Sequence, residues 1–88
     1  MFFAYGAKSL KTIHCPKLSS NMLYLTYVGS SSSLQDIFIN NMQCKDILAI
    51  PNFPGSVPAQ NSNYKNMVFH GADGTIEYNE TSGAWEIV

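Results

Sequence analysis

Residues 29–40 read GSSSSLQDIFIN. Taken alone, a glycine and four serines suggest a flexible linker, yet an alternating apolar pattern typical of a β-strand follows at once. A second stretch, FFAYGAKSLKTIHCP at residues 2–16, has the same order of residue types. In both, an aromatic residue precedes a glycine. After the glycine come, in this order, Ser-Leu, two polar residues, Ile, one further residue and an apolar residue. The serines therefore belong to a repeating unit.

The spacing between the two copies is constant. Equivalent apolar positions lie 24 residues apart in three pairs: Leu10 and Leu34, Ile13 and Ile37, and Cys15 and Ile39. A fixed spacing of this size is typical of solenoid repeats, in which each unit contributes one strand and is buried by the next copy. We therefore predict an ordered parallel ladder in which each residue of these pairs stacks beside its equivalent.

These residues resemble the BspA-like leucine-rich repeats of bacterial surface proteins and some phage tail proteins, whose unit looks like A-F-x-G-C-x-S-L-x-x-I-x-I-P. Residues 3–13 match it with Ala7 in place of the usual cysteine, and residues 27–39 match it with one additional serine and again no cysteine. A third, degraded copy fits residues 44–51 through Leu48 and Ile50. The resemblance implies a mainly β fold, a short leucine-rich-repeat-like β-solenoid over residues 2–51. The alternative is a small unrelated β-sandwich or roll.

The rest of the chain carries turn and strand signals. Prolines, Gly55 and several asparagines predict an irregular connection over residues 52–66, packed in part through aromatic and apolar side chains, namely Phe53, Val57 and Tyr64. Residues 67–88 predict a β-meander with strands at 67–70, 75–78 and 84–88, because Asp-Gly between alternating runs is a strong hairpin signal. One face of it would be buried through Ile76, Tyr78, Trp85 and Ile87. By resemblance, this meander would cap the array. The composition of residues 22–28, rich in Leu, Tyr, Thr and Val, predicts one further strand, with a helical turn as the alternative.

Length and charge limit the function classes. The 88 residues make one domain, residues 1–88, with a small core. Charged residues are only 12% of the chain and the net charge is −1, so the electrostatic footprint of a nucleic-acid-binding protein is missing. The sequence has no apolar run of membrane-spanning length and no secretory signal pattern, so no membrane insertion is expected. The compartment stays undetermined, and would be a cell surface or a virion if the resemblance holds.

The sequence contains none of the common motifs for catalysis or cofactor binding. We therefore expect no enzymatic activity, no catalytic residues, no cofactor and no metal. Four candidate zinc ligands, His14, Cys15, Cys44 and His70, lack the spacing of a zinc site. The two cysteines are expected to be buried free thiols, with a single disulfide between them as the alternative. The carboxylates are expected to be solvated charges.

The ladder also predicts which side chains face a partner. If the apolar residues point inward, then Thr12, His14, Asp36 and Phe38 point outward on adjacent rungs. An exposed Phe38 would be a natural protein contact, and the alternative is that residues 51–66 or the meander cover it. Phe2 and Phe3 lie at an end without a cap, so self-association through that end is expected.

Two functional hypotheses follow. The first is a non-catalytic protein-interaction or adhesion module, either the end of a longer repeat array or an assembly component of a phage or cell surface. The second is a small stand-alone accessory or inhibitor protein of a mobile element that acts on one protein partner. Both require a protein partner or a second copy of the chain, and neither involves nucleic acid.

Overall fold

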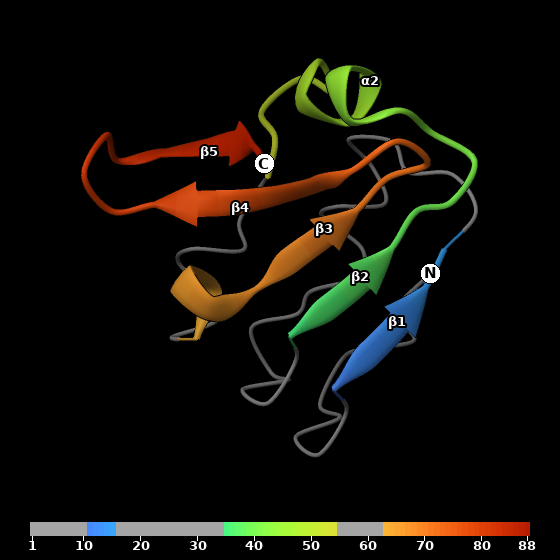
Figure 1. Ribbon diagram of the computed structural model, residues 1–88, viewed down its shortest axis with the longest axis horizontal. Helices are drawn as coiled ribbons and strands as arrows, with labels where there is room; N and C mark the ends of the chain where they lie inside the picture. Colours follow the sequence, from blue (N-terminus) through green and yellow to red (C-terminus); the bar gives the residue numbers. More distant parts are fainter. Residues whose placement is uncertain (1–10, 16–34, 55–62) are drawn as a thin grey trace.

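The computed structural model describes residues 11–15, 35–54 and 63–88 (Figure 1). Within these residues the chain is mainly β, with a single five-stranded mixed sheet in the order β1-β2-β3-β4-β5. The strands are β1 (Thr12–His14), β2 (Asp36–Phe38), β3 (Val68–His70), β4 (Thr75–Asn79) and β5 (Ala84–Ile87). The helical elements of the described ranges are α2 (Cys44–Leu48) and the 3₁₀ turn η2 (Tyr64–Asn66). The predicted mainly β class is confirmed, and the sheet is open.

The parallel part of the sheet follows the predicted spacing. β1 pairs with β2 in parallel, with Ile13 opposite Ile37. Both side chains are buried, at 4% and 5% exposure, because alternate residues of a strand point to opposite faces and these two point to the core. The predicted pairing of Ile13 with Ile37 is therefore confirmed. Leu10 and Leu34, the serines of residues 30–33 and the strand predicted at 22–28 lie outside the described residues.

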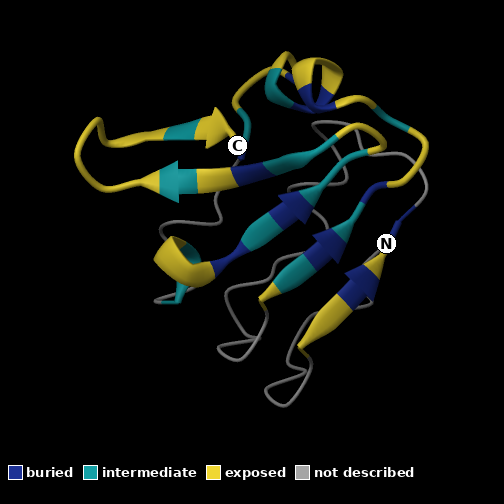
Figure 2. Ribbon diagram, in the orientation of Figure 1, coloured by how far each residue is buried: buried dark blue, intermediate teal, exposed yellow. Residues whose placement is uncertain are grey.

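The third parallel strand is β3, which the repeat spacing did not indicate. β3 pairs with β2 in parallel and places Phe69 opposite Ile37. Figure 2 shows buried positions recurring along β1, β2 and β3, and these include Ile13, Ile37 and Phe69. The step from Ile37 to Phe69 is 32 residues, eight more than the first step, so a search at the first spacing passes over it.

The degraded copy predicted at residues 44–51 is wrong, because this segment forms helix α2. Cys44 and Ile47 are buried and lie three residues apart on one helical face, and Ile50 is buried just after the helix. Leu48 and Ile50 also fit the alternation of a strand, and that coincidence produced the wrong prediction. The helix packs against β5 and so belongs to the C-terminal part of the fold.

Helix α2 begins with a cap supplied from another element. Gln43 occupies the N-cap position but its side chain caps nothing. The backbone N–H of Cys44 instead donates to Oδ1 of Asp73 at 2.8 Å, and the N–H of Ala72 donates to the carbonyl of Met42 at 2.7 Å. The turn between β3 and β4 therefore holds the start of the helix and satisfies a backbone group that short helices leave unpaired.

The antiparallel part of the sheet follows the hairpin signals. β3, β4 and β5 pair in chain order, and each begins or ends within one residue of the predicted bounds. Ile76 is fully buried, whereas its partner Ile87 is 52% exposed. Trp85 is half-buried and packs against the core, so the predicted buried face extends onto β5 only in part. Residue Gly83 has φ of 70°, a conformation that glycine adopts without strain, in the turn that precedes β5.

Aromatic side chains close the core beside β3. Phe69 makes edge-on contacts with Phe53 and Trp85, at centroid distances of 5.0 and 5.5 Å. Tyr64 contacts Tyr78 in the same way at 5.2 Å. Phe53 and Tyr64 thus pack as predicted, although residues 64–66 form the turn η2 rather than irregular chain. Val57 lies outside the described residues. No helix in the described ranges is both long enough and apolar enough to cross a membrane.

The turn between β3 and β4 lies so close to α2 that little room is left for a side chain at Gly71. A Cβ at this position would lie 2.9 Å from Sγ of Cys44 and 3.1 Å from both the nitrogen of Cys44 and the carbonyl oxygen of Met42. We expect Gly71→Ala to lower the free energy of unfolding by about 1–3 kcal/mol, because backbone atoms must move apart to admit the methyl group. Urea denaturation measures this loss. Gly74→Ala is the matched control, because its nearest neighbour would lie at 3.6 Å, and an equal loss in both variants would contradict the packing.

Candidate functional site

The candidate site is the outward surface of the three parallel strands, here called the outer face. It consists of Thr12 and His14 from β1, Asp36 and Phe38 from β2, and Val68 and His70 from β3. The β1 residues are exposed and the other four are half-buried. The structure places all four predicted residues of β1 and β2 on this one face, whereas Phe2 and Phe3 lie outside the described residues.

Three aromatic rings stack across the outer face. The His14 and Phe38 rings lie 4.8 Å apart and 9° from parallel, and the Phe38 and His70 rings lie 4.1 Å apart and 13° from parallel. The cause is the register, since neighbouring strands lie about 4.8 Å apart and equivalent side chains stand side by side. Both faces of the Phe38 ring therefore contact an imidazole, which leaves the ring edge accessible.

Phe38 was predicted to be exposed, or alternatively to be covered by residues 51–66 or the meander, and each prediction is met in part. The side chain is half-buried, so it is neither fully exposed nor covered. Part of its cover comes from His70, which lies in the segment predicted as a meander. The stack joins residues from three strands into one row, and an outward aromatic row of this kind offers apolar area beside hydrogen-bonding nitrogens.

Asp36 fixes the position of His70. The Nε2 of His70 donates to Oδ1 of Asp36 at 2.8 Å, across neighbouring strands and 34 residues apart in the sequence. The two side chains are 26% and 39% exposed, so this pair adds little to the stability of the fold. The hydrogen bond instead orients the imidazole of His70, because it holds this ring in the plane that stacks on Phe38.

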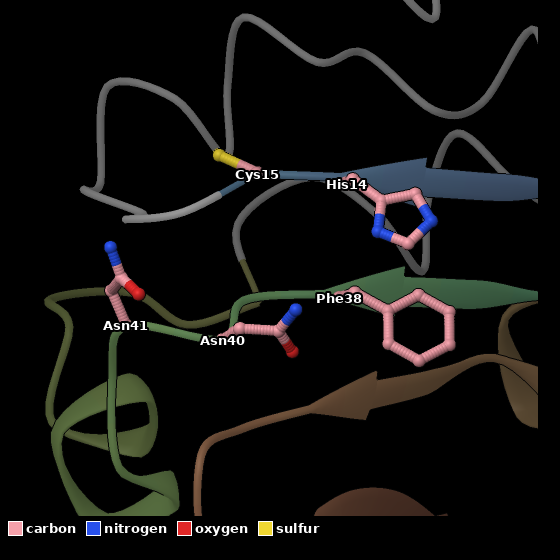
Figure 3. A pocket seen from close by; sticks show the side chains of 5 residues that line it. All are labelled: His14, Cys15, Phe38, Asn40 and Asn41. Carbon is pink, nitrogen blue, oxygen red and sulfur yellow. The ribbon is translucent and has the colours of Figure 1, made fainter.

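A hollow of about 220 Å³ lies beside the outer face, at the carboxyl ends of β1 and β2. Its lining consists of His14, Cys15, Phe38, Asn40 and Asn41 (Figure 3). Figure 3 shows the two rings side by side on their strands and the two asparagines on the chain that continues from β2. The hollow therefore combines ring edges with two side-chain amides.

The structure places the cysteines in the core. Cys15 and Cys44 are both buried, and no disulfide joins these two described residues. Burial, followed by the neighbouring Asp73 carboxylate, raises the pKa of the Cys44 thiol, so this thiol stays protonated and unreactive near neutral pH. Among the residues that the structure describes, no three His, Cys, Asp or Glu side chains gather closely enough to hold a metal ion.

Sequence reasoning missed four residues of the site. Val68 and His70 lie on the outer face only because β3 pairs with β2, and their segment has neither the Ser-Leu pair nor the 24-residue spacing of the first two units. Asn40 and Asn41 come after β2 and Ile39, and no pattern in the sequence singled them out. The outward position of His70 could have been found by aligning Val-Phe-His with Asp-Ile-Phe, both of which have one apolar residue at the centre.

Comparisons of the chain with models of known protein families, with curated proteins and with solved structures gave no match. The geometry of the outer face is therefore the basis for the function proposed below.

The cap of α2 gives the fold a defined response to acid. The N–H of Cys44 donates to Asp73 and so favours the carboxylate, which lowers the pKa of Asp73 below its usual value. A carboxyl group with a lowered pKa stabilises the folded state above its ordinary pKa, and this contribution is lost as pH falls through the lowered value.

We expect Asp73→Asn to flatten the dependence of stability on pH below about pH 4, where the ordinary aspartate titrates. The measurement is the thermal unfolding midpoint at a series of pH values from neutral to strongly acidic. Wild type should lose more stability than the variant over this range. Identical pH profiles for the two proteins would show that Asp73 does not act through its charge.

Proposed function

We propose that this chain is a non-catalytic protein-interaction module whose outer face binds a protein partner, in an adhesive or assembly role. The observation that carries the proposal is the half-exposed stack of His14, Phe38 and His70. Aromatic side chains are enriched at the centres of protein interfaces, where they supply contact area at a low cost in conformational entropy. The proposal includes the finer architecture, a short leucine-rich-repeat-like solenoid that a C-terminal meander closes.

The stack is suited to binding because it is already ordered. Each ring is restrained by its neighbour, and Asp36 restrains His70 by a hydrogen bond. Side chains that are fixed before association lose less freedom on binding, so more of the contact energy becomes affinity. The parallel register of β1, β2 and β3 supports the repeat-like part of the proposal, since it sets equivalent outward residues in one row.

The test is a binding measurement with two matched variants. Wild type is immobilised to isolate a partner, and the purified partner is then titrated against wild type, Phe38→Ala and Asp46→Asn. Phe38→Ala should weaken binding at least tenfold, as expected for a central aromatic contact. Asp46→Asn should bind as wild type does, because Asp46 is exposed on helix α2 and not on a strand of the outer face. The proposal would be contradicted if the two variants bound the partner with equal affinity, or if immobilised wild type retained no protein.

Self-association is the second part of the proposal, and it rests on the sequence at Phe2 and Phe3. Sedimentation velocity should show a species larger than the monomer for wild type at micromolar concentration. A variant with Phe2→Ser and Phe3→Ser should shift toward the monomer, while Phe38→Ala should leave the distribution unchanged. A wild-type protein that sediments only as a monomer would remove this part of the proposal.

A further inference from the structure

The hollow at the ends of β1 and β2 has the size and the lining of a small-ligand site. Its volume of about 220 Å³ is below the roughly 300–1,000 Å³ of pockets that hold drug-sized molecules. An occupant would therefore be a single small ring rather than a nucleotide or a peptide.

The described lining residues offer amides and rings to a ligand. None of these five residues is Asp, Glu or Lys. Two of them, His14 and the buried Cys15, are of metal-ligating types, and two such residues are too few for a metal site. What the described lining provides is hydrogen bonding beside an apolar wall.

The amides of Asn40 and Asn41 match hydroxyl groups. Each amide has an oxygen that accepts and an NH₂ group that donates, and a hydroxyl group also both donates and accepts. The edges of the His14 and Phe38 rings form the wall beside them, and the stack holds this wall in place. A ring compound that carries several hydroxyl groups and has one edge of lower polarity can contact the amides and the ring wall at the same time.

We propose that this hollow binds one uncharged sugar ring, as a free monosaccharide or as a unit of a glycan. The site is shallow and has few polar groups, so we expect a dissociation constant in the millimolar range. The inference does not rest on the proposed protein partner. It shares His14 and Phe38 with the outer face, but the residues that read the ligand, Asn40 and Asn41, lie outside that face.

The experiment is a titration of ¹⁵N-labelled full-length protein with glucose, galactose, mannose and N-acetylglucosamine, followed by NMR. At least one sugar should give saturable shifts centred on the side-chain amides of Asn40 and Asn41. Asn40→Ala and Asn41→Ala should each weaken binding about tenfold, the loss of one ordinary hydrogen bond. Gln43→Ala is the matched control, because this exposed amide lies outside the hollow and should leave binding unchanged.

Asn41→Asp provides a variant of nearly the same shape in case an alanine variant fails to fold. It should weaken binding while the thermal midpoint stays near that of wild type. Titration with glucuronate separates sugar recognition from anion binding, and it should bind no more tightly than glucose. The inference is overturned if no sugar gives saturable shifts, if the shifts lie elsewhere, or if the asparagine variants bind as wild type does. If Phe38→Ala loses partner binding while wild type binds no sugar, this inference is overturned and the proposed function stands.

Discussion

Phe69→Ala is expected to unfold most of the protein at room temperature or to lower its thermal midpoint sharply. Phe69 is 1% exposed, stands opposite both Ile37 and Ile76 in the sheet, and contacts Phe53 and Trp85 edge-on. Truncating a buried phenylalanine costs about 3–5 kcal/mol. The total stability of natural domains is about 5–15 kcal/mol, and short chains lie toward the lower end. One substitution thus removes most of the available stability.

The measurement for Phe69 uses a probe that the chain already contains. Trp85 is the single tryptophan and its ring lies 5.5 Å from that of Phe69, so its fluorescence reports on this cluster during urea denaturation. Ile87→Ala is the control, because Ile87 continues the same row of the sheet but is 52% exposed. We expect it to cost less than about 1 kcal/mol. A small loss for Phe69→Ala would show that β3 does not lie at the centre of the core.

Ile37→Ala is expected to have the second largest effect, a loss of about 2–5 kcal/mol. Ile37 is 5% exposed and stands between Ile13 and Phe69 in the parallel part of the sheet. Removing its side chain leaves a cavity between two neighbouring strands, because close-packed side chains on either side can only partly collapse into it. Urea denaturation measures the loss through the decrease in the transition midpoint.

The adjacent residue supplies the comparison for Ile37. Phe38 points to the opposite face and is half-buried, so Phe38→Ala should cost only about 1–2 kcal/mol, chiefly through the lost ring contacts. The larger side chain is thus expected to give the smaller loss of stability and the larger loss of partner binding. The reverse order of the two stability losses would mean that β2 has its faces exchanged, as a slip of one residue would cause.

Local repetition predicted the pairing of the first two strands correctly. Ile13 and Ile37 each follow a Ser-Leu pair at the same distance, and residues that repeat in this way stack because each needs the other to be buried. The hairpins of the C-terminal part were equally accessible, because Asp73-Gly74 marks a turn and the alternation on each side marks the strands. Each of these signals lies within a single short segment.

What could not be predicted depends on contacts between distant segments. Helix α2 has only five residues, too few to show helical periodicity, and its cap comes from Asp73, 29 residues beyond Cys44. Likewise His70 and Asp36 meet only because β3 lies beside β2. No residue near Asp36 signals this partner, so the completed outer face emerges only once the order of strands is known.

Residues from three distant segments form one aromatic row on the outer face. The most direct measurement is a nuclear Overhauser spectrum of the labelled protein, read for contacts between ring protons. The structure predicts cross-peaks from Phe38 to both His14 and His70, at ring distances of 4.8 and 4.1 Å, with none between the two histidines. A spectrum in which Phe38 contacts neither imidazole would contradict the parallel register and the binding surface built on it.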